Sequence, residues 1–505
     1  MKKIILLLFM ITVSIKNYGQ SPNIQWQKSF GGSISDAAYS IQKTFDSGYI
    51  VAGGAASNDG DVTGNHGGLD YWIIKLDNNG NIQWKKSYGG MYDDVAQTII
   101  QTSDSGYLVG GSSKSNDGDV IYPGQANYQH YWLIKLDNAG LIQWQQTTAL
   151  NAKAILSIQQ SYDGGYIVAG YREIGGDQDY DIAKLNINGI VSWQKFYGGS
   201  SNDMANSIQQ TLDGGYIITG GASSNDGDVD LNHGLWDYWI IKSDSIGNIQ
   251  WKKSYGGSSV DLAYSVLQNI NGEYIISGRS ESNDGDVVGN HGNTDLWIIK
   301  LDANGDLTQE KSLGGSNIDG FNKSEIKQTS DGGYIIAGAE ASTDGDVSFN
   351  YGSIDYWIIK LDNNLNIQWQ KSFGGSSTDF AYSILETNDG GFIIAGLSQS
   401  NDGLVLQNHG YYDYWIIKLG PYSSTNEYTS IEYNMNILSN PCTACYVLGK
   451  MNFKDLMVTD IFGRKINASF EESYNGFYIN LPSIYTGLFL IKNVLTGEVI
   501  KFIKE

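Results

Sequence analysis

One pattern recurs along most of this sequence, and it limits the possible folds more than any other feature. A motif reading Ile-Gln-Trp, or its equivalent, marks the same position in seven copies that lie 49 to 60 residues apart. Gln309 stands at this position in one copy, and the others carry Trp26, Trp84, Trp144, Trp193, Trp251 and Trp369. Self-similarity on this scale is typical of solenoids and propellers.

Each full copy contains four short apolar segments, which in one copy span 39–44, 48–54, 70–77 and 81–90. They are rich in Ile, Val, Tyr and Trp and are bounded by Gly, Asn or Asp, which is typical of β-strands. The third segment, DYWIIKLD, is apolar at nearly every position, so both of its faces should be covered. A four-stranded sheet covered on both faces and repeated seven times predicts an all-β, seven-bladed β-propeller.

The two ends of the repeat predict how the ring closes. The first copy begins with its fourth segment, at 23–32, and the last copy stops after its third, at 413–420. An N-terminal strand that completes the last blade would leave no open edge in the ring. Such closure is favoured because an unpaired strand edge exposes unsatisfied backbone groups. The count then comes to seven blades of four strands.

This architecture predicts a loop-rich face. The long loop between the second and third strands, which reads SNDGDVTGNHG at 57–67, should share one face with the Gly-Gly-Ser link that leads to each blade. Six links end in an aspartate, and we expect these carboxylates to form an incomplete ring near the channel mouth. The third copy lacks the loop, the link and the aspartate, which predicts a notch flanked by Arg172 and Glu173. The predicted ligand-binding face therefore comprises Asp36, Asp94, Asp203, Asp261, Asp319, Asp379 and Arg172.

The recurring SNDGD loop has two interpretations. Its oxygen-bearing side chains at alternating spacing suit calcium, whereas Asn-Asp-Gly is also a tight turn with side-chain-to-backbone hydrogen bonds. The candidate calcium ligands are Asn58, Asp59, Asp61, Asn116, Asp117, Asp119, Asn225, Asp226, Asp228, Asn283, Asp284 and Asp286. The loop histidines occur singly on four blades, so they cannot converge on one zinc ion and should have packing or turn roles. They are His66, His233, His291 and His409.

The motifs bear on two classes of enzyme, glycoside hydrolases and enzymes with a serine nucleophile. A glycoside hydrolase needs two facing carboxylates, which the aspartate ring could supply. Six near-equivalent copies nevertheless favour a feature of the repeat over a unique catalytic site. Serine nucleophile chemistry has no support, because the sequence contains no Gly-x-Ser-x-Gly motif.

Charge and the N-terminus indicate the compartment. The 505 residues carry a net charge of −22, which repels a phosphate backbone and makes nucleic acid an unexpected partner. Residues 1–20 combine Lys2 and Lys3 with an apolar run that is too short to span a bilayer, which predicts a secretory signal peptide. No later segment is long and apolar enough to cross a membrane.

The repeat also resembles known propeller families. Gly80 and Trp84 have the spacing of quinoprotein-type propellers, where the tryptophan docks between blades. The adjacent cysteine pair of the quinone enzymes is missing from the propeller, so no redox cofactor is expected. The turn TSDGGY, at 329–334, resembles the Asp box of sialidases, but the propeller holds only two arginines, which is too few for an arginine triad.

The C-terminal region leaves the repeat at about residue 432. Its ordered motifs are ILSNP (437–441), MVTDIFGRKI (457–466), a strand ending in GLFLIK (487–492) and GEVIKFIKE (497–505). They resemble the C-terminal sorting domain of type IX secretion in Bacteroidota, and the repeats resemble secreted propellers that carry this tail. The resemblance implies a small β-sandwich, the type IX secretion machinery as a partner, and a released or surface-attached product.

Together these observations predict four regions: a signal peptide (1–20), the propeller (21–420), a linker (421–431) and the sorting domain (432–505). We expect a monomeric, secreted or surface-attached protein that binds an extracellular glycan or protein through its acidic loop-rich face. Calcium is its possible cofactor, and the aromatic residues in LWDYW (235–239) and YYDYW (411–415) are candidates for stacking on sugars. The alternative is an extracellular polysaccharide-active enzyme that uses the ring carboxylates.

Overall fold

The computed structural model describes residues 21–147, 152–320, 322–422 and the strands between 445 and 504. The chain divides into two compact units, Met1–Tyr422 and Ser423–Glu505. The described residues form strands, turns and loops without a helix. The described residues accordingly contain no helical segment that could span a lipid bilayer.

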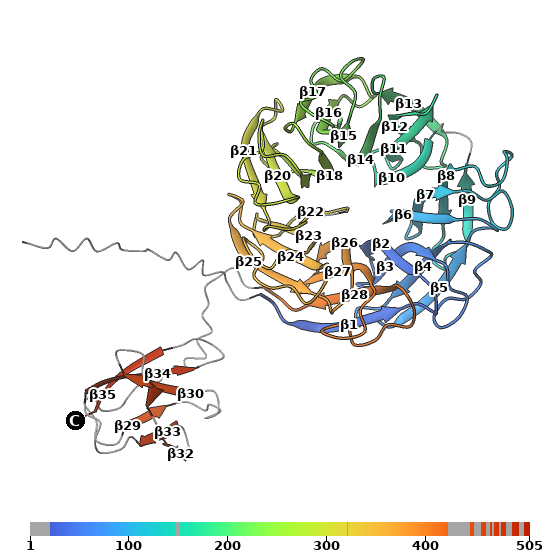
Figure 1. The fold of residues 1–505 in the computed structure, drawn as a ribbon. Coiled ribbons are helices and arrows are strands. Elements are labelled where there is room, and N and C mark those ends of the chain that lie inside the picture. Colours follow the sequence, from blue (N-terminus) through green and yellow to red (C-terminus); the bar gives the residue numbers. More distant parts are fainter. Residues whose placement is uncertain are drawn as a thin grey trace, which may run out of the picture. The chain divides into compact units, whose positions relative to one another are not determined.

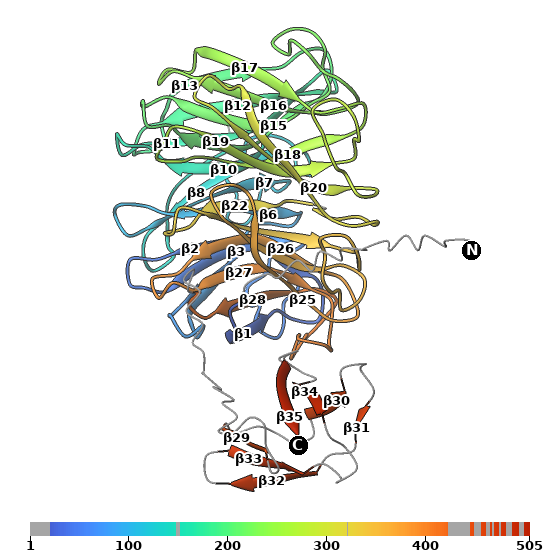
Figure 2. The same cartoon turned by 90° about the vertical axis from the view of Figure 1, so that its left-hand side faces the viewer.

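The first unit is a seven-bladed β-propeller of four-stranded antiparallel sheets (Figures 1 and 2), which confirms the predicted fold. The first blade comprises β2 (Asp36–Lys43), β3 (Tyr49–Ala55), β4 (Asp70–Leu76) and β5 (Ile82–Tyr88). The second comprises β6 (Asp94–Gln101), β7 (Tyr107–Ser113), β8 (His130–Leu136) and β9 (Ile142–Gln146). The third comprises β10 (Ala152–Gln160), β11 (Tyr166–Ile174), β12 (Asp177–Leu185) and β13 (Val191–Tyr197).

The remaining blades follow in chain order around the ring. The fourth comprises β14 (Asp203–Gln210), β15 (Tyr216–Ala222), β16 (Asp237–Ser243) and β17 (Ile249–Tyr255). The fifth comprises β18 (Asp261–Gln268), β19 (Tyr274–Ser280), β20 (Asp295–Leu301) and β21 (Leu307–Leu313). The sixth comprises β22 (Glu325–Gln328), β23 (Tyr334–Glu340), β24 (Asp355–Leu361) and β25 (Ile367–Phe373). The first strand of each blade is the innermost (Figure 1).

The seventh blade closes the ring as the sequence predicts. It comprises β26 (Asp379–Glu386), β27 (Phe392–Ser398), β28 (Asp413–Leu419) and the N-terminal strand β1 (Ile24–Phe30). β1 pairs antiparallel with β28, with Trp26 opposite Lys418 and Phe30 opposite Tyr414. The first and last segments of the propeller sequence therefore share one sheet, and the last blade has its full set of strands.

The blades are held together by the aromatic residues of the repeat. The third strand of each blade is buried along nearly its whole length, because neighbouring blades cover both of its faces. The Tyr71 hydroxyl donates to the Trp132 carbonyl of the next blade at 2.8 Å. The docking tryptophan, which six of the seven outer strands carry, packs between blades as predicted, since a Cβ on Gly80 would lie 2.8 Å from the Trp26 ring. A side chain larger than hydrogen at Gly80 would therefore displace this tryptophan.

A buried lysine in the third strand of every blade was not predicted from the sequence. In the fourth blade, Lys242 Nζ lies 2.9 Å from Asp213 in the first turn and 2.8 Å from the Gln250 side chain. The equivalent pairs, at 2.8–2.9 Å, are Lys75–Asp46, Lys135–Asp104, Lys184–Asp163, Lys300–Glu273, Lys360–Asp331 and Lys418–Asp389. Each lysine therefore ties a turn of its own blade to the third strand, and Lys75, Lys135, Lys242 and Lys360 also bond a glutamine of the fourth strand.

The second unit is described only in its strands. They form a three-stranded sheet of β29 (Cys445–Leu448), β33 (Gly476–Asn480) and β32 (Ser469–Ser473). A four-stranded sheet contains β31 (Lys465–Ile466), β30 (Leu456–Asp460), β34 (Gly487–Asn493) and β35 (Val499–Lys504). The described residues of this unit are all in β-strands, as expected for an all-β C-terminal domain. The signal peptide and the Asn-Pro motif at 440–441 lie outside the described residues.

The lysine pairs predict a specific loss of stability. Burial works against ionisation of Asp213, but hydrogen bonds from Lys242 and Thr211 outweigh it and lower the pKa of Asp213 to about 2. We expect Asp213→Asn to reduce the free energy of unfolding by about 1–2 kcal/mol at pH 7, because Lys242 stays buried without a counter-charge. Urea unfolding measures the change.

The matched control is Asp230→Asn, which breaks the exposed pair between Asp230 and Lys252. Exposed ion pairs contribute little, so this change should stay within about 0.5 kcal/mol. Equal effects of the two variants would contradict a structural role for the buried pair. Because the pKa of Asp213 is lowered, the difference should persist above pH 4 and vanish as the pH falls toward about 2.

Candidate functional site

The loop-rich face is built from the links between blades and the long loops between second and third strands. Figure 2 views the propeller edge-on, with the strand connections on its two opposite faces. In the first blade the link runs through Gly31, Gly32 and Ser33, and the long loop spans 56–69. These two segments contact each other directly through the residues that the sequence analysis singled out.

The aspartate at the end of each link is a buried anchor for the long loop of the same blade. Asp36 Oδ2 accepts hydrogen bonds from the Gly32 amide and the Ser57 hydroxyl, both at 2.8 Å. The same two contacts recur at Asp94, Asp203, Asp319 and Asp379 with their own glycine and serine partners. All six predicted ring aspartates, including Asp261, have 0% exposed surface.

This burial changes the interpretation of the aspartate ring. The sequence predicts these carboxylates near the channel mouth, and in the structure they have no exposed surface there. Burial raises the pKa of Asp36 and raises that of Asp94 to about 6, although the hydrogen bonds oppose the shift. As placed, these carboxylates hold the loops in position, and a ligand could reach them only if the loops opened.

The three candidate calcium ligands of an SNDGD loop contact different groups of the protein. In the first blade, Asp59 Oδ1 accepts the Ser33 amide at 2.7 Å, and Asn58 donates to the Asn65 carbonyl within the loop at 3.4 Å. Asp61 lies 3.5 Å from Lys85 of the outer strand. A Cβ on Gly32 would come within 2.3 Å of Asp59 Oδ1, which explains why glycine is required there.

The other three loops also bond their side chains to backbone groups, but not all of the partners are those of the first blade. The first aspartates accept amides of the link at 2.7–2.9 Å, as seen at Asp117, Asp226 and Asp284. The second aspartates accept the first glycine amide of the link at 3.2–3.4 Å, as seen at Asp119, Asp228 and Asp286. Asn116 bonds within its loop to the Gly124 carbonyl, and Asn225 accepts the Asn232 amide. Asn283 is the remaining candidate, at the corresponding position of the fifth blade.

Among the described residues, no three His, Cys, Asp or Glu side chains gather closely enough to hold a metal ion. The contacts of the SNDGD loops match the turn interpretation, with side chains bonded to backbone groups. Calcium binding stays a prediction.

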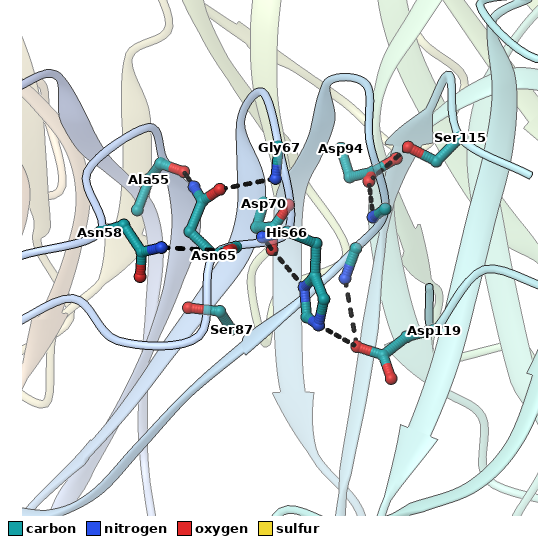
Figure 3. A network of polar contacts seen from close by, with 12 residues as sticks. Ala55, Asn58, Asn65, His66, Gly67, Asp70, Ser87, Asp94, Ser115 and Asp119 are labelled. Atoms are coloured by element: carbon teal, nitrogen blue, oxygen red, sulfur yellow. Dashed lines mark hydrogen bonds and ion pairs between the residues drawn. The ribbon is translucent and has the colours of Figure 1, made fainter. Parts of the chain in front are cut away.

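The loop histidines pair with an aspartate that the sequence analysis did not single out (Figure 3). His66 Nδ1 lies 2.7 Å from Asp70 Oδ2, and its Nε2 lies 3.8 Å from Asp119 of the next blade. The same pairing, at 2.6–2.7 Å, recurs at His233–Asp237, His291–Asp295 and His409–Asp413. Partial burial opposes protonation of His66, but the hydrogen bond and charge of Asp70, with the charge of Asp119, raise its pKa.

The sixth blade departs from this pattern. Tyr351 replaces the histidine and gives Asp355 only its backbone amide. Burial then raises the pKa of Asp355 to about 7, with a further contribution from the charge of Asp379. Glu340, at the end of β23, is also completely buried, and burial raises its pKa to about 8. Asp355 Oδ1 and Glu340 Oε1 lack hydrogen-bond partners within the described parts of the chain.

The third blade replaces the long loop with a tight hairpin at Gly175 and Gly176, where the sequence predicts a notch. Arg172 pairs with Asp179 at 2.8 Å and stacks on the Phe196 ring at 3.7 Å, so its guanidinium is already engaged. Asp181 occupies the place of the buried tryptophan of the other third strands. Burial raises the pKa of Asp181 to about 7.

Exposed apolar side chains project from the long loops, and the sequence analysis missed them. Five of them, one on each of five blades, expose between 56% and 79% of their surface. They lie one or two residues after the buried valine of the loop and are Ile121, Leu231, Val288, Phe349 and Leu406. The signal was present in the sequence as an apolar residue inside a polar loop.

The aromatic clusters expected to stack on sugars are mostly core residues. Tyr238, Trp239, Tyr414 and Trp415 are buried between blades. Tyr411 is 58% exposed, and Trp236 and Tyr412 are half-buried at the start of their strands. The exposed large apolar side chains of the long loops are therefore more often aliphatic than aromatic.

Comparisons with known proteins place this chain near solved propellers only at low similarity. No protein-family model matches it, and no curated protein does. The WD40 domain of Neurospora crassa Pan2 is 10% identical, covering 80% of this chain and 98% of its own, with a TM-score of 0.45. A Bacteroides caccae protein of unknown function is 12% identical, covering 63% and 96%, with a TM-score of 0.34.

A third solved structure is Chaetomium thermophilum Sqt1 bound to the N-terminus of ribosomal protein L10. It is 11% identical to this chain, covering 78% of this chain and 98% of its own, with a TM-score of 0.42. Likeness at this level carries no functional argument. The fold assignment rests on the seven blades of the structure itself.

The buried carboxyl of Asp355, which lacks an imidazole partner, predicts a pH dependence of stability. A raised pKa means that the folded state holds the proton more tightly than the unfolded chain does. Stability is therefore lost as the pH rises from the unfolded value near 4 through the folded value of about 7 for Asp355. We expect Tyr351→His to supply the missing imidazole partner and to reduce the loss between pH 5 and pH 8 by on the order of 1 kcal/mol.

Urea unfolding at pH 5, 6.5 and 8 measures this effect. Tyr351→Phe is the matched control, because it keeps the ring but offers no hydrogen bond from it, and its pH dependence should equal that of the native chain. The interpretation fails if Tyr351→His loses as much stability across this range as the control does.

Proposed function

We propose that this chain is a secreted or surface-attached binding protein whose loop-rich face recognises an extracellular protein. A β-propeller is a scaffold suited to binding and interaction, with rigid blades that position variable loops. The observation that carries the proposal is the set of exposed apolar side chains at Ile121, Leu231, Val288, Phe349 and Leu406. These side chains do not form one contiguous patch, but they present apolar groups among polar ones on the same face of a rigid ring, as the apolar contacts of a protein interface do.

The chemistry of this face favours a protein over a glycan. Glycan recognition relies on exposed aromatic faces, whereas five of the eight exposed large apolar side chains of the long loops are aliphatic. Carboxylates and amides surround them, including Asp119 and Asp230, which are partly or largely exposed. The partner should therefore present apolar side chains among basic ones, because complementary charge steers association and sets specificity.

The buried carboxylates weigh against the alternative of a polysaccharide-active enzyme. Glycoside hydrolysis needs two carboxyl groups that both reach the bond to be cleaved. The six link aspartates have no exposed surface and are bonded to loop groups. Their repetition on six blades also fits a role in holding loops.

The test of the binding face uses the mature chain, residues 21–505, against arrays of extracellular proteins and of polysaccharides. The combined variant Leu231→Ser, Val288→Ser and Leu406→Ser should weaken protein binding about 10-fold or more, because it removes apolar area at the centre of the interaction. Biolayer interferometry measures the affinity, which should also fall with added salt.

The control variant changes three exposed apolar residues in the short turns of the opposite face, Phe45→Ser, Leu212→Ser and Ile270→Ser. It should bind as the native chain does. Binding to polysaccharides that depends on Tyr411 but not on the aliphatic residues would replace the protein proposal with a glycan one. Release of new reducing ends from any polysaccharide would show an enzyme instead.

We further propose that the type IX secretion machinery exports the chain through its C-terminal domain. The support is the ordered motif set after residue 432, together with the predicted signal peptide. Deleting 432–505 should leave the propeller in the periplasm of a Bacteroidota host that has this system, whereas the full chain should reach the surface or medium. Cell fractionation measures the distribution.

A host without a functional type IX pore should retain the full chain as well, which provides the control. A truncated chain that still reaches the surface would contradict the proposal for the C-terminal domain and leave the proposal for the binding face unaffected.

A further inference from the structure

The propeller encloses a polar cavity of about 350 Å³ at its centre. Residues of the innermost strands β2, β6, β10, β14, β18, β22 and β26 line it. This volume lies in the range of small-molecule sites, which are about 300–1,000 Å³. The lining is mostly hydroxyl and amide groups, so an apolar ligand would leave them without partners.

A ring of hydroxyls organises the wall of this cavity. The serine in the middle of an innermost strand accepts the backbone amide of the neighbouring innermost strand, as Ser40 does from Ile99 at 3.3 Å. The same bond joins Ser157 to Ile208, Ser207 to Val266, Ser265 to Ile326, and Ser383 to Ile41. A serine that accepts an amide in this way can still donate its own proton, as Ser383 does to the Glu325 carboxylate.

The sixth blade interrupts this ring. Asp319 and Thr329 are separated by two more residues than Asp379 and Thr387, the equivalent pair of the seventh blade. The additional chain forms an irregular segment in which Gly320 and Asn322 have positive φ, and β22 is only four residues long. This segment places Lys323 in the cavity wall.

Glu325 takes the place of the serine in this blade. Its Oε2 accepts the Ile384 amide at 2.9 Å, as the serines do elsewhere, and its Oε1 lies 2.8 Å from Lys327. Hydrogen bonding and charge from Lys327 thus neutralise the carboxylate locally. The cavity lining contains no other acidic side chain among the described residues.

Lys323 is left as the uncompensated charge in the cavity. No hydrogen bond or ion pair involves its ammonium group within the described part of the chain, although the charge of Glu325 is close enough to act on it. Burial in the channel wall lowers the pKa of Lys323. The Tyr39 and Tyr264 side chains also line the cavity, and burial raises the pKa of both, so their hydroxyls stay protonated.

We propose that the central cavity binds a small hydroxylated carboxylate, with Lys323 as the counter-charge and the serine and tyrosine hydroxyls as hydrogen-bond partners. A single free ammonium group matches a single carboxylate, and charge-assisted hydrogen bonds of this kind are the stronger ones. The surrounding hydroxyls and glutamines both donate and accept, which matches the hydroxyls of a sugar acid. The cavity is lined mainly by the innermost strands rather than by the exposed apolar side chains of the long loops, and the proposal does not depend on the function proposed for those side chains.

Isothermal titration calorimetry with the mature chain, residues 21–505, tests the site directly. The probes are D-glucuronate, D-glucose as the same ring without the carboxylate, and inorganic phosphate. We expect glucuronate to bind with a dissociation constant of about 1 mM or tighter, and glucose and phosphate to bind at least about 10-fold more weakly. Lys323→Met should weaken glucuronate binding about 10- to 100-fold, as expected for a hydrogen bond to a charged group.

Three further variants separate the site from general effects of charge and folding. Lys28→Met removes one positive charge from the outermost strand β1 and should bind glucuronate as the native chain does. Lys323→Arg keeps the charge and should retain binding within a few-fold. Tyr264→Phe removes one donor and should weaken binding, with thermal melting confirming that each variant is folded.

The result that supports the proposal is carboxylate binding that requires the charge at position 323. Glucuronate and glucose binding equally, phosphate binding more tightly than glucuronate, or no loss of affinity in folded Lys323→Met would each overturn it. Absence of glucuronate binding to the native chain at about 10 mM would overturn it as well, because a cavity site of useful affinity would be occupied at that concentration.

Discussion

Antiparallel pairing between β1 and β28 is the constraint on which the rest of the propeller depends. It joins residues at the start of the propeller to residues almost 400 positions later, with Trp26 opposite Lys418. Because neighbouring blades cover both faces of every third strand, no blade is complete until both of its neighbours are in place. Closure therefore stabilises all seven blades together, and it sets the size of the central cavity that the innermost strands enclose.

Within that ring, the polar residues that recur most regularly serve the architecture. The link aspartates bind the loop of their own blade, and the first SNDGD aspartate holds the next part of the same link. The third-strand lysines do the same for the opposite face. These groups are buried or bonded, so the positions open to a ligand are the ones that vary between copies, such as the exposed Leu406 and Val288.

Charged residues in unusual positions occur mainly in the two blades that depart from the repeat. The third blade exchanges its long loop for a hairpin and its buried tryptophan for Asp181. The sixth exchanges a histidine for Tyr351 and a channel serine for Glu325, and it gains the segment that carries Lys323. Real proteins break their local rules mainly at sites with a function or a compensating interaction. In the sixth blade these changes place Lys323, Glu325 and Lys327 in the channel wall, which is otherwise lined by uncharged residues.

The sequence alone determined the strands, their order, the number of blades and the closing strand, because each of these follows from short-range patterns repeated seven times. It also indicated the loop-rich face and the tryptophan that docks between blades. Only the tertiary structure decided that Asp36 and its equivalents are buried and that Lys242 reaches Asp213. It likewise decided that Lys323 faces a cavity. These facts depend on distances between segments of neighbouring strands and blades, and a pattern read along one chain does not contain such distances.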